Sequence, residues 1–248
     1  MFEPLKDLFD PPIKEHRIFF LHIAKCGGTS ISNAIAKCYK PWRAENVAKV
    51  ATLDEEAARF ADQHALSGYR HVRRDLLNYM MAMPSIKCLS GHFQYSHIAH
   101  ETFLNQWHFV TVLRDPVARW LSHYRYNAAR GRISIPIEEF IETNQARSFG
   151  RAFVDEITED MDKNTFGIEA LTEIALSRYR KFTIIGTIEQ SADFAQQFEK
   201  KFGHKLRIPH LNRTPDRQGR DDLSGAILQR ITDLCAPDIQ LHRALFPA

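Results

Sequence analysis

Hydrophobic residues along this chain fall into short continuous runs and longer segments with helical spacing. Continuous runs rich in β-branched and aromatic residues predict buried strands, at Arg17–Ile23, Ile86–Ser90, Trp107–Leu113 and Phe182–Ile188. Apolar positions three and four residues apart predict helices, at Ile31–Tyr39, Val47–Ala61, Tyr69–Met83, His97–Leu104, Pro136–Thr143, Ile168–Tyr179, Ser191–Phe202, Asp222–Cys235 and Asp238–Leu245. Strands that alternate with helices predict an α/β fold, with a central parallel sheet flanked by helices.

Capping residues sharpen two of these boundaries. Asp115 and Pro116 are expected to start a helix that continues to about residue 129 and stops before Gly131. In the same way, we expect Ser191 to cap the helix that begins there, and Gly203 to end it.

Length and composition predict one domain. The chain has 248 residues, of which 44% are hydrophobic and 25% charged, so it can bury one substantial core. We expect a single domain over residues 1–248, with residues 1–16 as a polar lead-in. Residues 144–166 are charged and poorly periodic, which predicts a loop that could move as a lid. The net charge of +3 is too small to favour nucleic acid, and it is compatible with small anionic ligands.

The four cysteines, Cys26, Cys38, Cys88 and Cys235, form no CxxC pair. This favours free thiols in a reducing compartment and argues against structural zinc. The longest apolar run is far too short to cross a bilayer, and the N-terminus lacks a signal pattern. We therefore expect a cytoplasmic protein, although a lumenal enzyme cut from its membrane anchor would look similar.

Residues 22–30, His-Ile-Ala-Lys-Cys-Gly-Gly-Thr-Ser, join the first predicted strand to the first helix. Gly27 and Gly28 let the backbone approach an anion closely, and the helix directs its first N–H groups at the same anion. Lys25 adds positive charge, and Thr29 and Ser30 add hydroxyl donors. The alternative is a structural Gly-Gly turn beside a surface lysine. Because the lysine precedes the glycines, ATP with magnesium fits less well.

A second phosphate contact is expected where the strand Trp107–Leu113 ends. Arg114 follows this strand at its carboxyl end, where ligands bind in open α/β sheets, and Ser122 lies about two turns into the next helix. A guanidinium offers paired, charge-assisted hydrogen bonds to a phosphate. The alternative is that Arg114 pairs locally with Asp115 and that Ser122 is an ordinary helix residue.

These segments together resemble a known family. HIAKCGGTS resembles the 5′-phosphosulfate-binding loop of sulfotransferases that depend on 3′-phosphoadenosine-5′-phosphosulfate (PAPS), and FVTVLRDPVARWLSHYRY resembles their 3′-phosphate-binding strand and helix. SGHF is similar to the Gly-His-Phe element of the uronosyl 2-O-sulfotransferase-like carbohydrate branch. FTIIGTIEQ, PHLNRT and APDIQLHRAL are similar to weaker family elements, so the matches run from about residue 17 to residue 245. Ala24 and Cys26 stand where the family usually has Pro and Thr.

The resemblance implies a P-loop-like sulfotransferase fold, PAPS as donor, adenosine 3′,5′-bisphosphate as product and no metal. The acceptor is implied to be a hydroxyl, mostly on a sugar. Lys25 would stabilise the leaving oxygen, Arg114 and Ser122 would hold the 3′-phosphate, and the 5′-phosphosulfate would be held by Lys25, Cys26, Gly27, Gly28, Thr29 and Ser30.

The resemblance also implies that His92 is the catalytic base, a role that suits an imidazole titrating near neutrality. The alternative is a histidine that satisfies a turn carbonyl. A metal site of His92 with His97 and His100 lacks a flanking carboxylate and is not favoured.

Basic clusters leave further alternatives open. Arg213 and Arg217 either close over the cofactor or belong to a solvated loop, and Arg70, Arg73 and Arg74 are expected on an exposed helix face rather than against an acidic acceptor. For the chain as a whole, a P-loop kinase-like phosphotransferase and a non-catalytic nucleotide-binding homologue are the alternative functions. A glycan, a lipid-linked sugar and a small hydroxylated metabolite all remain candidate acceptors.

Overall fold

The computed structural model describes residues 13, 16–39, 49–64, 68–208 and 223–247, which divide into two compact units. The sheet unit contains the described residues up to His22, those within Gly27–Val112 and those from Phe182 to residue 208. The helical unit contains Ile23–Cys26, Leu113–Lys181 and the described residues from 223 onward. The single domain expected from the sequence stays a prediction.

The sheet unit is built on five strands in the order β2-β3-β1-β4-β5. Their bounds are β1 Ile18–Leu21, β2 Lys49–Thr52, β3 Ile86–Gly91, β4 His108–Leu113 and β5 Ile184–Thr187. β1 runs parallel to β3 and β4, with Ile18 opposite both Cys88 and His108, and β2 runs parallel to β3. The predicted α/β fold with a central parallel sheet is confirmed.

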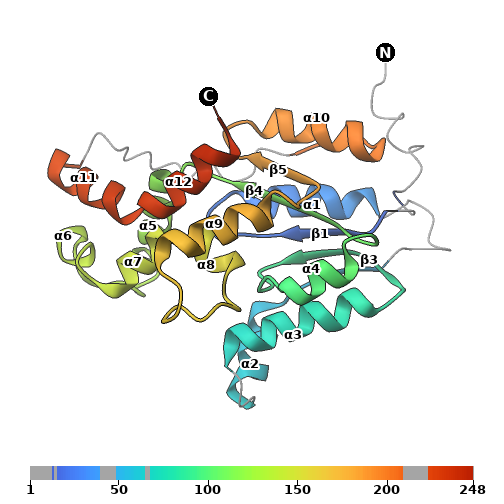
Figure 1. Ribbon diagram of the computed structural model, residues 1–248, viewed down its shortest axis with the longest axis horizontal. Coiled ribbons are helices and arrows are strands. Elements are labelled where there is room, and N and C mark those ends of the chain that lie inside the picture. Colours follow the sequence, from blue (N-terminus) through green and yellow to red (C-terminus); the bar gives the residue numbers. More distant parts are fainter. Residues whose placement is uncertain (1–12, 14–15, 40–48, 65–67, 209–222, 248) are drawn as a thin grey trace. The chain divides into compact units, whose positions relative to one another are not determined.

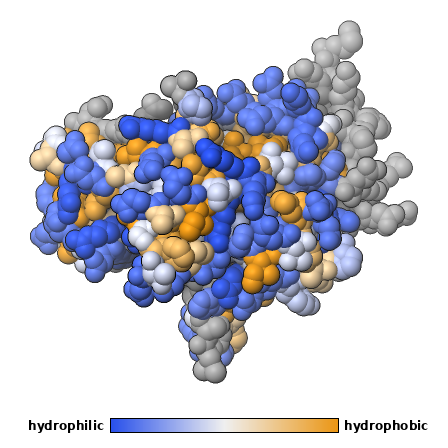
Figure 2. Space-filling view, viewed as in Figure 1, coloured by the Kyte–Doolittle hydropathy of each residue, from blue (hydrophilic) through white to orange (hydrophobic). Residues whose placement is uncertain are grey.

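Helices cover both faces of this sheet (Figure 1). Their bounds are α1 Gly28–Cys38, α2 Glu55–His64, α3 Tyr69–Ala82, α4 His97–Phe103 and α10 Ser191–Phe202. Apolar residues of α1 and α10, such as Ile31, Ile35 and Phe198, form one buried cluster with Phe20 and Val110 of the sheet. α3 and α4 lie along the opposite face. Hydrophilic residues predominate on the face drawn in Figure 2, where apolar residues gather only in scattered patches.

The helical unit consists, in its described residues, of α5 Pro116–Ala128, α6 Ile137–Phe140, α7 Asn144–Gly150, α8 Ala152–Ile157, α9 Ile168–Tyr179, α11 Gly225–Leu234 and α12 Ala236–Leu245. Its core packs Trp120 of α5 against Phe140, Phe149 and Ile231. Among the described residues, no helix combines the length and the apolar character needed to cross a membrane.

The capping predictions were largely correct. The Asp115 carboxylate accepts a hydrogen bond from the Ala118 amide at 2.8 Å, and Pro116 is the first residue of α5. Gly203 ends α10 with φ 67° in the left-handed region. The predicted cap at Ser191 is wrong, because Gln190 precedes the helix as its N-cap and Ser191 is already helical. The four cysteines, all of them among the described residues, are thiols outside any disulfide.

The helix predicted over Val47–Ala61 is wrong in its first half. Residues 49–52 form β2, whose Val50 and Thr52 lie opposite Cys88 and Ser90 of β3. Asp54 then accepts a hydrogen bond from the Ala57 amide at 2.8 Å, and α2 follows. Pairing with a distant strand therefore outweighed the helical spacing of this segment.

The loop predicted over residues 144–166 is wrong for residues 144–157, which form α7 and α8. The Thr143 hydroxyl caps α7 by accepting a hydrogen bond from the Ala146 amide at 3.1 Å. In the first turn of α8, the amides of Phe153 and Val154 donate to the carboxyl group of Asp238, at 3.0–3.1 Å. That cap comes from 84–85 residues further along the chain, where no local pattern reveals it.

Candidate functional site

In the sheet unit, a glycine takes the N-cap position at the start of α1. Gly27 is its N-cap with φ 71°, a left-handed conformation that glycine adopts without strain, and no side chain caps the helix here. A Cβ atom on Gly27 would lie 2.6 Å from Cδ1 of Ile188. Among the described residues, the first N–H groups of α1 thus have no side-chain cap, an arrangement that suits an anion.

His22, just after β1, packs directly on this helix start. A Cβ atom on Gly28 would lie 2.0 Å from Cδ2 of the His22 ring, so only glycine fits beneath the imidazole. Burial, with a smaller contribution from the neighbouring His92, lowers the pKa of His22 to about 3. His22 is therefore a neutral ring at physiological pH.

His92, just after β3, is held by the same residue. Its ring stacks on His22 with centroids 4.2 Å apart and an interplanar angle of 26°. Its Nδ1 lies 2.9 Å from the His22 carbonyl oxygen. Because a carbonyl only accepts, Nδ1 must carry the proton, and in the neutral ring the basic lone pair then lies on Nε2.

The backbone around His92 is also fixed. Gly91 has φ 113°, and a Cβ atom there would lie 2.9 Å from the Leu53 amide nitrogen. The Arg73 guanidinium donates a hydrogen bond to the His92 carbonyl. The expectation that Arg73 lies on an exposed helix face is therefore wrong, since Arg73 is partly buried and supports the turn that carries His92.

The remaining loop residues differ in exposure. Thr29 is exposed at the helix start, whereas Ser30 is buried. Cys26 is also buried; its amide donates to the Ile23 carbonyl at 3.4 Å, and its thiol lies 3.9 Å from the Ala24 carbonyl oxygen. The Cys26 amide is thus engaged inside the loop.

In the helical unit, Lys25 is held at both its backbone and its side chain. Its φ of 71° is strained for a residue with a Cβ atom. Arg114 donates a hydrogen bond to the Lys25 carbonyl at 3.3 Å. The Lys25 ammonium lies over the Tyr126 ring, 3.9 Å from its centroid, and the Arg130 guanidinium carbon lies 3.6 Å from the same centroid.

This cluster gathers positive charge. Burial first, and then the charges of Arg130 and Arg114, lower the pKa of Lys25. Within the described part of the chain, no carboxylate forms an ion pair with Lys25, Arg114 or Arg130. A group of cations without a matching carboxylate is suited to an incoming anion. The local alternative, in which Arg114 pairs with Asp115, is therefore not observed.

Other candidate residues fall outside these groups. Ser122 is half-buried on α5. His100 is fully buried: its ring stacks on that of Phe109 with centroids 4.0 Å apart, and its Nδ1 lies 2.8 Å from the Tyr95 hydroxyl oxygen. His97 Nδ1 lies 3.8 Å from Oε1 of Glu101. Arg213 and Arg217 lie outside the described residues.

Sequence reasoning gave no role to three residues that the structure brings into these groups: His22, Tyr126 and Arg130. A signal existed for two of them. Ser122 and Tyr126 are spaced four residues apart on α5, and Arg130 follows four residues later, just beyond the end of the helix at Ala128. The role of His22 depends on contacts with Gly28 and His92, and one of these lies 70 residues away.

Comparisons with known proteins complete these observations. A search of curated proteins gave no match. Among solved structures, the chain is similar to a sulfotransferase from Alicyclobacillus acidocaldarius, with a TM-score of 0.46 and 12% identity, covering 93% of this chain and 95% of that chain. The model of the Sulfotransferase family matches residues 13–241. Since that match spans most of the 248 residues, the chain belongs to the sulfotransferase family.

Proposed function

We propose that this sulfotransferase transfers a sulfuryl group from PAPS to an acceptor hydroxyl on a carbohydrate. The observation that carries the proposal is the cluster of Lys25, Arg114 and Arg130, which no described carboxylate neutralises. A nucleotide with a 5′-phosphosulfate and a 3′-phosphate supplies the negative charge that such a cluster attracts.

The chain's own groups fit such a donor. The N–H groups of Gly27, Gly28, Thr29 and Ser30 at the start of α1 would bind the 5′-phosphosulfate, with Lys25 beside it in the same loop. Arg114 and Ser122 would bind the 3′-phosphate, and the guanidinium would supply the stronger hydrogen bonds. Cys26 would contribute to the shape of the loop, and Arg213 and Arg217 would close over the donor.

The donor supplies an activated sulfur–oxygen bond. His92 Nε2 takes the proton of the acceptor hydroxyl as the acceptor oxygen forms its bond to sulfur. The bond from sulfur to the phosphate oxygen breaks, and the electron pair stays on that oxygen. Lys25 stabilises the resulting charge. His22 supports the base by fixing its tautomer through the carbonyl contact at 2.9 Å and by stacking on its ring.

The carbohydrate acceptor is proposed from the SGHF segment, residues 90–93, which resembles the carbohydrate branch of the family. The proposal is tested by incubating the protein with sulfur-labelled PAPS and a panel of glycans, glycosylated small molecules and simple alcohols. Transfer of label to a sugar hydroxyl is the expected result. Transfer only to non-sugar alcohols would contradict the carbohydrate assignment. Magnesium-dependent ATP consumption without label transfer would contradict the donor.

Two variants separate the roles of Lys25 and His92. Lys25→Ala should lose most of the transfer, by a factor of about 100 or more, because the leaving oxygen loses its cation. His92→Ala should lose turnover by a similar factor, about 100-fold, yet still bind adenosine 3′,5′-bisphosphate in calorimetry. Lys37→Ala and His64→Ala, on the exposed sides of α1 and α2, serve as controls. Normal turnover by His92→Ala would contradict the assignment of the base.

A further inference from the structure

Tyr126 makes contacts that the proposed donor-binding roles leave unexplained. Its ring receives the ammonium of Lys25 at 3.9 Å and the guanidinium of Arg130 at 3.6 Å, each measured to the ring centroid. Two like charges repel each other, so their gathering on one ring requires a compensating attraction. The negative face of an aromatic ring supplies it.

The lysine side chain needs such a partner. Lysine carries a compact charge on a stem of four carbons, so an unheld ammonium samples many positions. Arg114 fixes only the backbone of Lys25, through its carbonyl oxygen. Within the described residues, the Tyr126 ring is the group found in direct contact with the Lys25 ammonium.

We propose that Tyr126 is a positioning residue for sulfuryl transfer, whose ring face holds the Lys25 ammonium in place while Arg130 holds the ring. This inference rests on the proposed function, because it assumes that Lys25 acts at the leaving oxygen. An ammonium that is already placed loses less freedom when the leaving oxygen becomes charged. The gain is therefore made in the transition state and affects kcat more than binding of the nucleotide.

The charged groups around Lys25 disfavour its ammonium form, which is why the ammonium needs the ring face as a partner. The positive charges of Arg130 and Arg114 add to burial in lowering the pKa of Lys25. Replacing Arg130 by glutamine removes one of these charges, so the pKa of Lys25 should rise in Arg130→Gln.

The first test observes the contact without any turnover. Lysine amines are reductively methylated with ¹³C-formaldehyde and a borane reductant, which keeps their charge. The Lys25 resonance is identified by its loss in Lys25→Ala. A methyl group over the Tyr126 ring should show an upfield ring-current shift. Tyr126→Phe should keep that shift and Tyr126→Leu should lose it. A wild-type Lys25 resonance without the shift would overturn the proposal.

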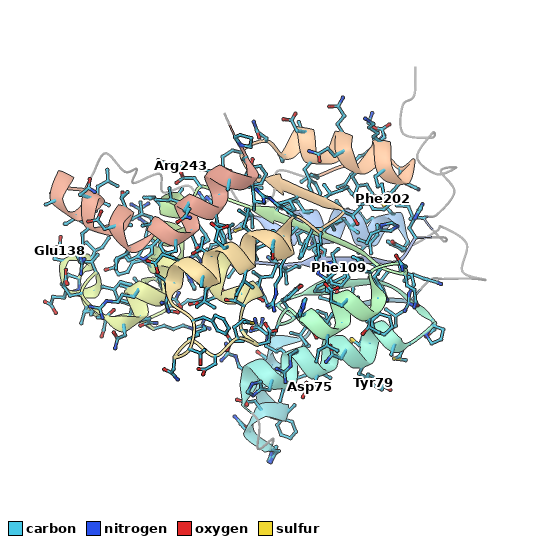
Figure 3. The ribbon with its side chains drawn as sticks, in the orientation of Figure 1. Asp75, Tyr79, Phe109, Glu138, Phe202 and Arg243 are labelled. Carbon is cyan, nitrogen blue, oxygen red and sulfur yellow. The ribbon has the colours of Figure 1, made fainter. Side chains whose placement is uncertain are left out.

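The second test measures sulfuryl transfer by unmethylated protein. Tyr126→Leu should lower kcat about 10-fold, the effect expected from losing a partly buried cation–π contact, with the affinity for adenosine 3′,5′-bisphosphate changed less than about 3-fold. Tyr126→Phe keeps the ring face and should restore most of the lost kcat. The control is Tyr79→Leu, which removes an exposed tyrosine on the outer side of α3, 65% exposed, and should leave kcat unchanged (Figure 3).

The outcomes distinguish the positioning role of Tyr126 from the proposed sulfuryl transfer on which it rests. Absence of transfer by the wild-type protein would overturn both. Transfer by the wild type with an unchanged kcat in Tyr126→Leu would overturn the positioning role alone. A loss in Tyr126→Phe equal to that in Tyr126→Leu would also overturn it, because it would assign the effect to the hydroxyl rather than to the ring. Thermal unfolding of each variant identifies any that fails to fold, in which case Tyr126→Phe and the wild-type spectrum still decide.

Discussion

Gly28→Ala places a methyl group where the imidazole of His22 lies. The added Cβ atom would be 2.0 Å from Cδ2 and 2.4 Å from Nε2 of His22, both far inside van der Waals contact. The ring cannot yield by bending, and it is itself stacked on His92 at 4.2 Å. We therefore expect Gly28→Ala to lower the free energy of unfolding by about 1–3 kcal/mol, the range for overpacking in a filled site.

Once the His22 ring is removed, the effect of Gly28→Ala on the free energy of unfolding should be set by the backbone and should no longer be destabilising. Gly28 is the first residue of α1 and has no positive φ, so alanine suits the backbone. In a His22→Ala background, Gly28→Ala should therefore be neutral or should stabilise the protein by up to about 1 kcal/mol. The difference between the two backgrounds is a coupling energy of about 1–4 kcal/mol, which overlaps the range for residues in contact.

The assay is urea denaturation followed by circular dichroism on the wild type, both single variants and the double variant. Gly225→Ala is the matched control, because Gly225 is also the first residue of a helix, α11, and an added Cβ atom there meets nothing within 4 Å. It should be neutral or stabilise by about 0.4–1 kcal/mol. An equal loss from Gly28→Ala in both backgrounds would refute the steric explanation.

Two further predictions concern buried charge and backbone strain. Burial raises the pKa of Asp238 to about 7, against the opposing effects of Arg119 and the α8 amides, so the native state favours the protonated carboxyl. The free energy of unfolding should then fall as pH rises from 3.8 toward about 7. In urea titrations at several pH values, Asp238→Asn should flatten this pH dependence, and an unchanged dependence would contradict the role of Asp238. Because Lys25 has φ 71°, Lys25→Gly should unfold at a higher urea concentration than Lys25→Ala, with a free energy of unfolding about 1 kcal/mol larger. Both variants should lose most of the sulfuryl transfer, and equal urea midpoints would argue against backbone strain.

Sequence patterns predicted the elements whose signals are local. The strand at Trp107–Leu113 and the helix after it follow from a run of β-branched and aromatic residues and from the Asp115-Pro116 start. The α8 helix could not be predicted in this way, because its cap is the Asp238 carboxylate from α12. β2 likewise becomes a strand by pairing with β3, and its own four residues do not decide between strand and helix.

The candidate site also contains residues that a local sequence pattern predicts and residues that it does not. Lys25, Gly27 and Gly28 follow from a loop pattern, because glycines and a lysine between a strand and a helix already indicate an anion. The tautomer of His92 could not be predicted, since it depends on the His22 carbonyl, 70 residues earlier. Tyr126 lies 101 residues from Lys25 in the sequence, and tyrosine on a helix is usually a packing residue, so its contact with the ammonium also required the structure.

The two departures from the usual loop pattern have a physical explanation in the local geometry. Cys26 is 1% exposed, its thiol lies 3.9 Å from the Ala24 carbonyl oxygen, and its amide is bonded to Ile23. The side chain at position 26 therefore faces the interior, where a thiol is buried more readily than a hydroxyl. Ala24, unlike proline, keeps an amide hydrogen and a freer φ angle. The neighbouring left-handed conformations at Lys25 and Gly27 set the shape of the turn in its place. Since neither change removes a donor from the start of α1, the proposed anion binding should not require the usual Pro and Thr.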